Sequence, residues 1–274
     1  MRRSRALGPV LCALLSFRSA DALAEVVIGP GVLPAIKVYS SDHYRLLAGT
    51  QITSPSLSVP PADTYLRVDD AVNFEGGGSV RVDGGTYRGG NHTFTGTDPF
   101  FTAAAGNALE LRNFTANIHG GTFTGGDTYS VTERSDHAIG GVGLYAAAST
   151  VNIYGGRFDA GLLTIPNVPF YPSNYPRVPD AFFVASTVHW HGGDLSYIVL
   201  SSSSALHIYG TNFETVGFTV YGKFADRSSF SLLVYDGLSK VVLHDLVPEP
   251  HTITIAVLAC LSFPARHRVF RARH

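Results

Sequence analysis

Cysteine is almost absent from the sequence, and the two residues present, Cys12 and Cys260, lie near the two ends of the chain. The body between the ends therefore has no thiol, which excludes a disulfide framework and thiolate chemistry there. Charge is also sparse, at 15% of residues. Between Glu25 and Val247 the chain has 12 Lys and Arg residues against 19 Asp and Glu residues, so the body is acidic. This balance argues against nucleic acid as a partner, because phosphate binding needs clustered positive charge.

No helical hydrophobic period of useful length occurs between the two ends of the chain. Gly is abundant, with 29 residues, while Trp and Met occur once each. Frequent glycine together with short alternating apolar runs is typical of many short strands that turn often. The body is therefore predicted to be all-β.

The first 24 residues have the order of a secretory signal peptide. The three parts of that signal are a basic start, an uncharged apolar run and a small-residue cleavage site, at Arg2, Arg3 and Arg5, at residues 6–17, and at Ala22 and Ala24. We expect a signal peptidase to cleave after Ala24, following transport by the export machinery. The alternative is a buried N-terminal helix, although the apolar run is too short to span a bilayer.

The last 28 residues have a second ordered pattern, made of a Pro-Glu-Pro motif, an uncharged apolar run and an arginine cluster. These parts lie at Pro248, Glu249 and Pro250, at residues 252–263, and at Arg266, Arg268, Arg271 and Arg273. An apolar segment followed by basic residues is a stop-transfer arrangement. At about 1.5 Å per helical residue the run reaches only about 20 Å, short of a hydrocarbon core of roughly 30 Å. A buried final strand with a basic tail is the alternative.

The order of these three parts resembles the PEP-CTERM tail of exported Gram-negative proteins, over residues 247–274 alone. The resemblance implies a hydrophobic transmembrane helix that an exosortase, a membrane protease, recognises and removes. It also implies a final location in the cell envelope, on the cell surface or in the extracellular matrix. Residues 25–246 then form the body of the protein.

A repeat in the body is the strongest internal signal. Its unit is apolar, polar, apolar, polar, Gly, Gly, any residue, aromatic. The copies cover residues 79–87, 115–123, 150–158, 187–195 and 205–213, and a shorter echo covers 72–77. Period-two alternation predicts a strand with one buried face, and the glycines predict a corner. Another short strand is expected before each unit, at residues 108–111, 142–145, 181–184 and 197–200.

The spacing of the glycine corners predicts a solenoid. The last interval, from Gly192 to Gly210, is 18 residues. At about 3.3 Å per residue this traces roughly 60 Å, enough for one three-sided coil. The earlier intervals are about twice as long, so each must hold a second, degenerate coil or a loop. Three loops are expected, over residues 91–101, 127–137 and 163–180, and all of them leave one side of the solenoid.

The architecture that this pattern favours is a right-handed parallel β-helix. The repeat resembles, more loosely than the tail does, the glycine-rich coils of β-helix surface proteins with PEP-CTERM tails. An antiparallel β-sandwich or barrel is the alternative. Asp236-Gly237 fits the turn of a hairpin that caps the C-terminal end.

Outward positions of the repeat form two polar columns if the coils stack in register. Six of these residues are candidates for a carbohydrate-binding strip: Asn152, Tyr154, His189, His191, His207 and Tyr209. Asn, His and Tyr offer ring faces and hydrogen bonds to sugar hydroxyls. Ordinary solvated strand surface is the alternative, because Tyr is common on exposed strands.

A catalytic or metal site is not evident from the sequence. His189 and His191 have chelating spacing, and His207 could stack beside His189, but two ligands are too few for a metal. A glycosidase needs two carboxylates at a fixed separation, and the candidates Asp83, Asp159, Asp194 and Glu214 form no clear pair. No cofactor is expected. The function expected is a non-enzymatic structural or carbohydrate-binding surface protein, with extracellular polysaccharide as a partner. A β-helix lyase or glycoside hydrolase, or an adhesin using the loop 163–180, remain alternatives.

Overall fold

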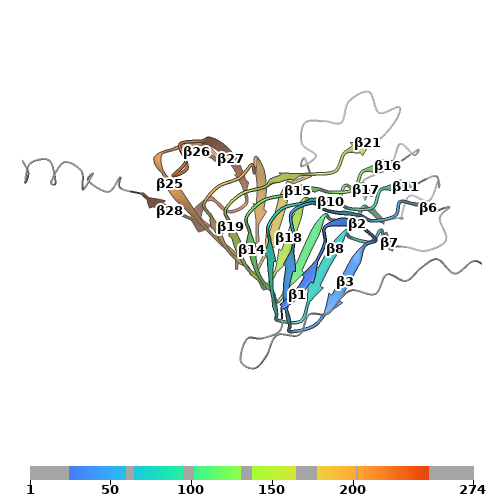
Figure 1. The fold of residues 1–274 in the computed structure, drawn as a ribbon. Helices are drawn as coiled ribbons and strands as arrows, with labels where there is room; N and C mark the ends of the chain where they lie inside the picture. The colour runs from blue at the N-terminus through green and yellow to red at the C-terminus, as the bar shows by residue number, and fades with distance from the viewer. Residues whose placement is uncertain are drawn as a thin grey trace, which may run out of the picture.

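The computed structural model describes residues 25–59, 65–94, 102–130, 138–164, 178–201 and 203–246, which form a parallel β-solenoid (Figure 1). This confirms the all-β solenoid prediction and excludes the antiparallel sandwich as the body's architecture. The predicted signal peptide 1–24 and sorting tail 247–274 lie outside the described residues and stay predictions. Within the described ranges, no helix has the length and apolar character needed to cross a bilayer.

Three sheets form the walls of the solenoid. Sheet A consists of β1 (Glu25–Ile28), β4 (His43–Leu46), β9 (Ser79–Val82), β14 (Thr115–Ile118), β19 (Thr150–Ile153), β23 (Thr187–Trp190), β25 (Ala205–Val216) and β28 (Val241–Asp245). Sheet B consists of β2 (Gly31–Leu33), β5 (Thr50–Thr53), β10 (Thr86–Arg88), β15 (Thr122–Thr124) and β20 (Arg157–Asp159). Sheet C consists of β3 (Ile36–Tyr39), β8 (Val72–Glu75), β13 (Leu109–Arg112), β18 (Leu144–Ala147), β22 (Ala181–Val184), β24 (Tyr197–Leu200) and β27 (Ser229–Tyr235).

The long repeat intervals each correspond to one coil. In sheet A, Ser79 pairs with Thr115, Thr115 with Thr150 and Thr150 with Thr187, in parallel register. The two bare coils of 18 residues stand at the ends, where Glu25 pairs with His43 and Thr187 pairs with Ala205. The 18-residue coil is therefore confirmed, and of the two alternatives for the longer intervals the second, degenerate coil is excluded.

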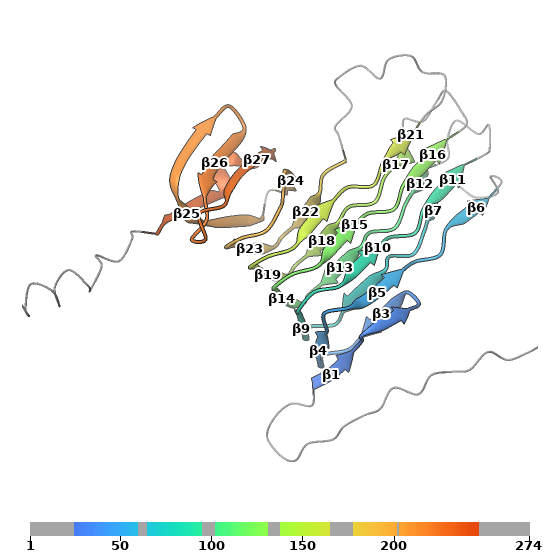
Figure 2. The same cartoon turned by 45° about the horizontal axis from the view of Figure 1, so that its top comes forward.

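The longer coils instead extend into an arm of two further sheets beyond sheet B. One sheet contains β6 (Leu57–Val59), β11 (His92–Phe94), β16 (Thr128–Ser130) and β21 (Leu163–Thr164), and the other contains β7 (Tyr65–Arg67), β12 (Thr102–Ala104) and β17 (Ala138–Ile139). Figure 2 shows both sheets on the same side of the body. The predicted loops do leave from one side, but their first residues form stacked strands. Residues 95–101, 131–137 and 165–177 of those loops lie outside the described residues.

Glycines join the arm to the body. The N–H groups of Gly106, Gly126, Gly141 and Gly161 donate to the carbonyl oxygens of Gly90, Gly106, Gly126 and Gly141, with N···O distances of 2.8–3.0 Å. We call these five residues the glycine seam. Along the seam, glycines at which the chain leaves the body for the arm (Gly90, Gly126 and Gly161) alternate with glycines at which it returns (Gly106 and Gly141). A Cβ atom at Gly106, Gly126, Gly141 or Gly161 would overlap a backbone carbonyl of a neighbouring segment. The repeat pattern did not predict this seam.

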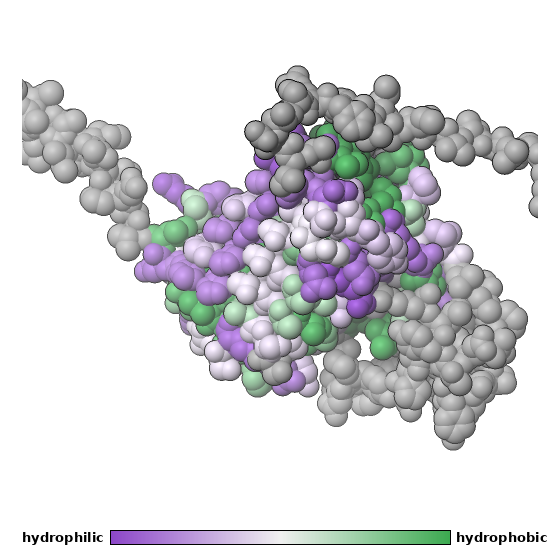
Figure 3. Space-filling model, turned by 90° about the horizontal axis from the view of Figure 1, so that it is seen from below, coloured by the Kyte–Doolittle hydropathy of each residue, from purple (hydrophilic) through white to green (hydrophobic). Residues whose placement is uncertain are grey.

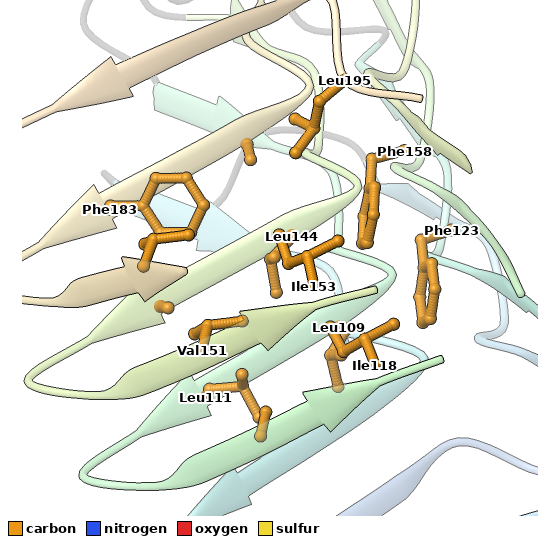
Figure 4. Packing of buried hydrophobic residues seen from close by; sticks show 14 of the residues in the cluster. Leu109, Leu111, Ile118, Phe123, Leu144, Val151, Ile153, Phe158, Phe183 and Leu195 are labelled. Atoms are coloured by element: carbon orange, nitrogen blue, oxygen red, sulfur yellow. The ribbon is translucent and has the colours of Figure 1, made fainter. Parts of the chain in front are cut away.

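The core lies between the three walls and follows the alternation read from the sequence. Leu109 and Leu111 of sheet C face Ile118 of sheet A, and all three are fully buried (Figure 4). The aromatic residues that follow three of the corners, Tyr87, Phe123 and Phe158, point inward from sheet B. The rings of Phe123 and Phe158 stack with centroids 4.8 Å apart, which places one ring above the other in successive coils.

The corners between sheets A and B depend on the second glycine of each pair. Gly85, Gly121, Gly156 and Gly193 have φ values of 100–118°, a conformation that side chains disfavour. Thr211 occupies the equivalent position after Gly210. No corner to sheet B forms there, and β25 continues as one strand of 12 residues with a β-bulge between Thr211 and Glu214. The fifth predicted corner is therefore wrong, because threonine is β-branched and avoids positive φ.

The echo at residues 72–77 belongs to a different wall from the other copies. Its strand, β8, pairs with β3 and β13 in sheet C, so it is equivalent to the short strands expected before each unit. Those strands are confirmed as β13, β18, β22 and β24, with the first two shifted by one or two residues. Alternation alone could not assign a strand to one wall or the other, because both walls bury one face.

Antiparallel strands close the C-terminal end of the solenoid. The strand β26 (Thr219–Lys223) pairs with both β25 and β27, joining sheets A and C into one 16-stranded sheet. A cap of this kind was expected, but Asp236-Gly237 is not its turn. These residues lead from β27 into a short 3-10 helix η1 (Leu238–Lys240) and on to β28, which is parallel to β25. At the opposite end the bare first coil leaves Val27 and Val32 exposed. Figure 3 shows one face of the molecule, on which apolar patches lie among hydrophilic residues.

Candidate functional site

The outward surface of sheet A brings the six predicted strip residues together. Period-two alternation places Val151, Ile153 and their equivalents inside, so the intervening side chains point to solvent. In-register pairing then aligns the outward residues of successive coils in two columns. One column contains Asn117, Asn152, His189 and His207, and the other contains His119, Tyr154, His191, Tyr209 and His244. We call these nine residues the ladder face.

The second column is a continuous stack of rings. The centroid of Tyr154 lies 4.9 Å from that of His119 and 4.8 Å from that of His191. Tyr209 lies 4.1 Å from His191 and 4.5 Å from His244. All four interplanar angles are between 8° and 14°. The spacing follows from the distance between neighbouring strands, about 4.7–4.9 Å.

The first column contributes amides and imidazoles beside the rings. Asn152 donates from Nδ2 to Oδ1 of Asn117 at 2.9 Å. The rings of His189 and His207 stack with centroids 4.9 Å apart, as the sequence suggested. Nδ1 of His189 shares a hydrogen bond with the Tyr209 hydroxyl at 2.9 Å, which links the two columns. The ladder face is therefore ordered by its own contacts.

His244 belongs to this face and was not identified from the sequence. It lies on β28, which adds to sheet A beside β25, and its Nε2 atom is 3.0 Å from Nδ1 of His207. The repeat unit gave no signal for it, because β28 carries no glycine corner. A parallel strand after the cap can be placed only from the three-dimensional structure.

Burial makes two histidines of the ladder face, His189 and His191, less basic. Desolvation lowers the pKa of His189, and the nearby His207 and His244 lower it further. Desolvation also lowers the pKa of His191, with additional contributions from His189 and His244. Both pKa values are lowered for the same reason, because burial and neighbouring positive charges disfavour the protonated ring.

Ion pairs occupy the N-terminal end of the same surface. Arg81 and Arg45 each place Nε 2.6 Å from a carboxylate oxygen of Asp83. The hydrogen bond from Arg81 lowers the pKa of Asp83, burial opposes this shift, and Arg45 lowers the pKa again. Of the glycosidase candidates, Asp83 is thus held by two arginines, and Asp159 is held by Arg157 at 2.8 Å.

The other carboxylate candidates lie apart from the ladder face. Asp194 lines a hollow of about 560 Å³ between the last corner and the cap, together with Asp226 and Ser228–Ser231. Hydrogen bonds from Ser228 lower the pKa of Asp226. Glu214 lies on the antiparallel part of β25, opposite Tyr221.

A second hollow, of about 320 Å³, lies on the outer surface of sheet C. Its lining includes Lys37, Asp69, Asn73, Glu110 and Arg112. Glu110 is buried and accepts hydrogen bonds from Arg112 Nε at 2.6 Å and from an amide nitrogen of Asn107 at 3.0 Å. These contacts hold the carboxylate in place within the wall.

The described part of the chain contains no complete set of metal ligands, because no three His, Cys, Asp or Glu side chains converge there. The facing nitrogens of His207 and His244 supply two donors, and structural zinc sites need four ligands. The sorting residues, the cleavage residues Ala22 and Ala24, and residues 165–177 of the adhesin loop lie outside the described residues.

Comparisons with known proteins identify no relative. No family model, no curated protein and no solved structure matches the chain.

Proposed function

We propose that this chain is an exported protein of the cell envelope or extracellular matrix whose β-solenoid binds polysaccharide through the ladder face. The observation that carries the binding proposal is the stack of five rings along one outward column of sheet A. A linear polymer lying along the solenoid axis would meet one ring per coil.

The chemistry of the ladder face suits sugars. Ring faces pack against the apolar faces of a sugar, and amide, imidazole and hydroxyl groups can both donate and accept hydrogen bonds. The face is flat, and its side chains are already held by mutual contacts such as that between Asn152 and Asn117. Such preorganisation lowers the entropic cost of binding.

The two terminal patterns support the location. A signal peptide would direct export, and the Pro-Glu-Pro motif with its apolar run and arginines would direct processing by an exosortase. The coils would wind in the right-handed sense, which is the usual handedness of connections between parallel strands.

Deletion of residues 247–274 tests the sorting proposal. We expect the variant to change its distribution between membrane, cell-surface and medium fractions. Replacing Glu249 by Ala should reproduce part of this change, whereas replacing Thr252 by Ala should not. An unaltered distribution of the deletion variant would contradict the proposal.

Glycan binding to the purified full chain tests the ladder face. Replacing Tyr154 or Tyr209 by Ser should weaken binding to immobilised polysaccharides by about tenfold, the effect of about 1.4 kcal/mol. Replacing Tyr145, which points outward from sheet C, by Ser is the matched control and should leave binding unchanged. Binding that is insensitive to the two ladder variants would remove the ladder face as the site.

A hydrolase or lyase is the second candidate function, and the hollow that contains both Asp194 and Asp226 favours it. A screen for cleavage of neutral and acidic polysaccharides tests this candidate. Activity that is lost in Asp194→Asn and kept in Asp159→Asn would favour an enzyme at this hollow.

A further inference from the structure

The histidines of the ladder face alternate with tyrosines. The second column reads His119, Tyr154, His191, Tyr209 and His244, so each tyrosine ring lies between two imidazoles. Neighbouring histidines in this column are two strands apart, about 10 Å. That separation is close to the Debye length at 0.1 M salt, so protonated rings in this column would repel one another only weakly.

Each tyrosine would also stabilise protonated neighbours. An imidazolium ion over the face of an aromatic ring is attracted by the ring quadrupole. Tyr209 lies 4.1 Å from His191 and 4.5 Å from His244, both within the range of this interaction. The column can therefore become a row of regularly spaced positive charges.

Few negative charges face this row. From β14 to β28, the outward positions of sheet A are Thr, Ala, Asn, His, Tyr and Val, without a carboxylate. At the N-terminal end, Glu25 and Asp83 lie beside Arg45 and Arg81. At the other end the charged residues Asp245 and Lys223 lie at the end of β28 and opposite Thr211, respectively.

In the first column the histidines contact one another directly, without a tyrosine between them. His189 and His207 stack directly on one another, and His207 shares a hydrogen bond with His244. One proton between the two nitrogens satisfies this pair, and a second proton would break the hydrogen bond. In the second column, by contrast, the ring of Tyr154 lies between His119 and His191.

We propose that the ladder face binds a linear polysaccharide bearing carboxylate groups, and that it binds this polymer more tightly when its histidines are protonated. The inference rests on the proposed glycan-binding function and specifies its ligand and its regulation. Carboxylates of the polymer would accept charge-assisted hydrogen bonds from the imidazolium groups, while the sugar rings rest on the tyrosines. The acidic body would disfavour contacts of the same polymer elsewhere.

The direction of the pH effect follows from linkage. The pKa of His191 is lowered in the free protein by burial and by neighbouring histidines, so this ring is neutral at pH 7.5. A bound carboxylate favours the protonated ring and raises that pKa. Binding therefore strengthens as the pH falls from 7.5 toward the lowered pKa of the free ring, and it takes up protons.

Titration calorimetry on the full chain at pH 7.5 and pH 5.0 tests the proposal. The ligands are polygalacturonate, its methyl-esterified form and double-stranded DNA. We expect polygalacturonate to bind at least tenfold more tightly at pH 5.0, with net proton uptake measured in two buffers of different ionisation enthalpy. The methyl-esterified polymer should bind with similar affinity at both pH values.

The variant His191→Phe separates charge from stacking. It keeps a ring between Tyr154 and Tyr209 but cannot be protonated, so it should lose most of the pH dependence of polygalacturonate binding. Arg157→Gln, which removes an exposed cation from sheet B, is the control and should change neither the affinity for polygalacturonate nor its pH dependence.

Four results would overturn the inference. Equal binding of both polymers at both pH values would do so while leaving the glycan-binding function intact, as would pH dependence that survives in His191→Phe. DNA binding with the same pH dependence would indicate an unselective surface for polyanions. Absence of binding to either polysaccharide at either pH would refute the proposed function and, with it, this inference.

Discussion

Replacing Gly126 by alanine places a methyl group inside the glycine seam. The new Cβ would lie 2.6 Å from the carbonyl carbon of Gly90, and closer still to its oxygen. Optimal carbon–carbon separations are about 3.5–4.0 Å, so the two segments would have to move apart by about 1 Å. Alanine has no side-chain rotamer that relieves the overlap.

Two hydrogen bonds oppose this movement. Gly126 N–H donates to Gly106 O at 2.8 Å, and Gly141 N–H donates to Gly126 O at 2.9 Å. Each buried group left unsatisfied costs about 1–3 kcal/mol, and overpacking costs about 1–3 kcal/mol. We therefore expect Gly126→Ala to lose about 3–6 kcal/mol, a large part of the 5–15 kcal/mol typical of folded proteins.

Urea unfolding followed by tryptophan fluorescence measures this loss. Trp190 is the single tryptophan and is 1% exposed in the core, so its emission reports on the folded solenoid. Gly84→Ala is the matched control, because its Cβ would meet only Ala48, at 3.4 Å, an ordinary contact. A free energy of unfolding for Gly126→Ala within about 1 kcal/mol of that control would refute the reasoning.

Three further predictions concern single positions. Ala148 has φ 48° at the corner where Asn113 of the preceding coil has φ 53°. Positive φ is less costly for Asn than for Ala, so Ala148→Asn should raise the free energy of unfolding by about 1 kcal/mol in urea titrations. A decrease would show that the backbone at Ala148 is not strained. Phe123→Ala removes the middle ring of the buried stack on sheet B and should lower the free energy of unfolding by about 3–5 kcal/mol, whereas Phe123→Leu should cost less. Asp83→Asn should lower the melting temperature at pH 7, and this loss should shrink as the pH is lowered below 3.8. The reason is that the hydrogen bond from Arg81 lowers the pKa of Asp83, so its stabilising effect is lost as the pH falls through that lowered pKa. A loss that stays constant from pH 7 down to pH 2 would contradict this.

The walls of the solenoid could be predicted because each one satisfies a local rule. Val151 and Ile153 alternate with polar residues, and Gly156 allows the positive φ that the corner requires. The alignment of Asn152 with His189 then follows from equal spacing to the glycine corners. Six of the nine ladder residues could therefore be predicted from the sequence, whereas their function stays a proposal.

The arm could not be predicted in the same way. Its strands are short, such as β16 and β21, and none of them carries the repeat unit. Their register is fixed by pairing with the coil above and below, and by the approach of Gly126 to Gly106 and Gly141. A glycine needed for close backbone approach looks the same in sequence as a glycine needed for a turn.

The amino-acid sequence by itself determined the wound stack of short strands, the corners with two glycines and the outward columns of Asn, His and Tyr, because alternation and backbone freedom are local properties. The tertiary structure alone decided that each long interval is one coil with an arm, that β25 continues past Gly210 without a corner to sheet B, and that His244 joins the ladder face. These features depend on pairing between residues far apart in the chain, and pairing energies are set by neighbours that no local pattern specifies.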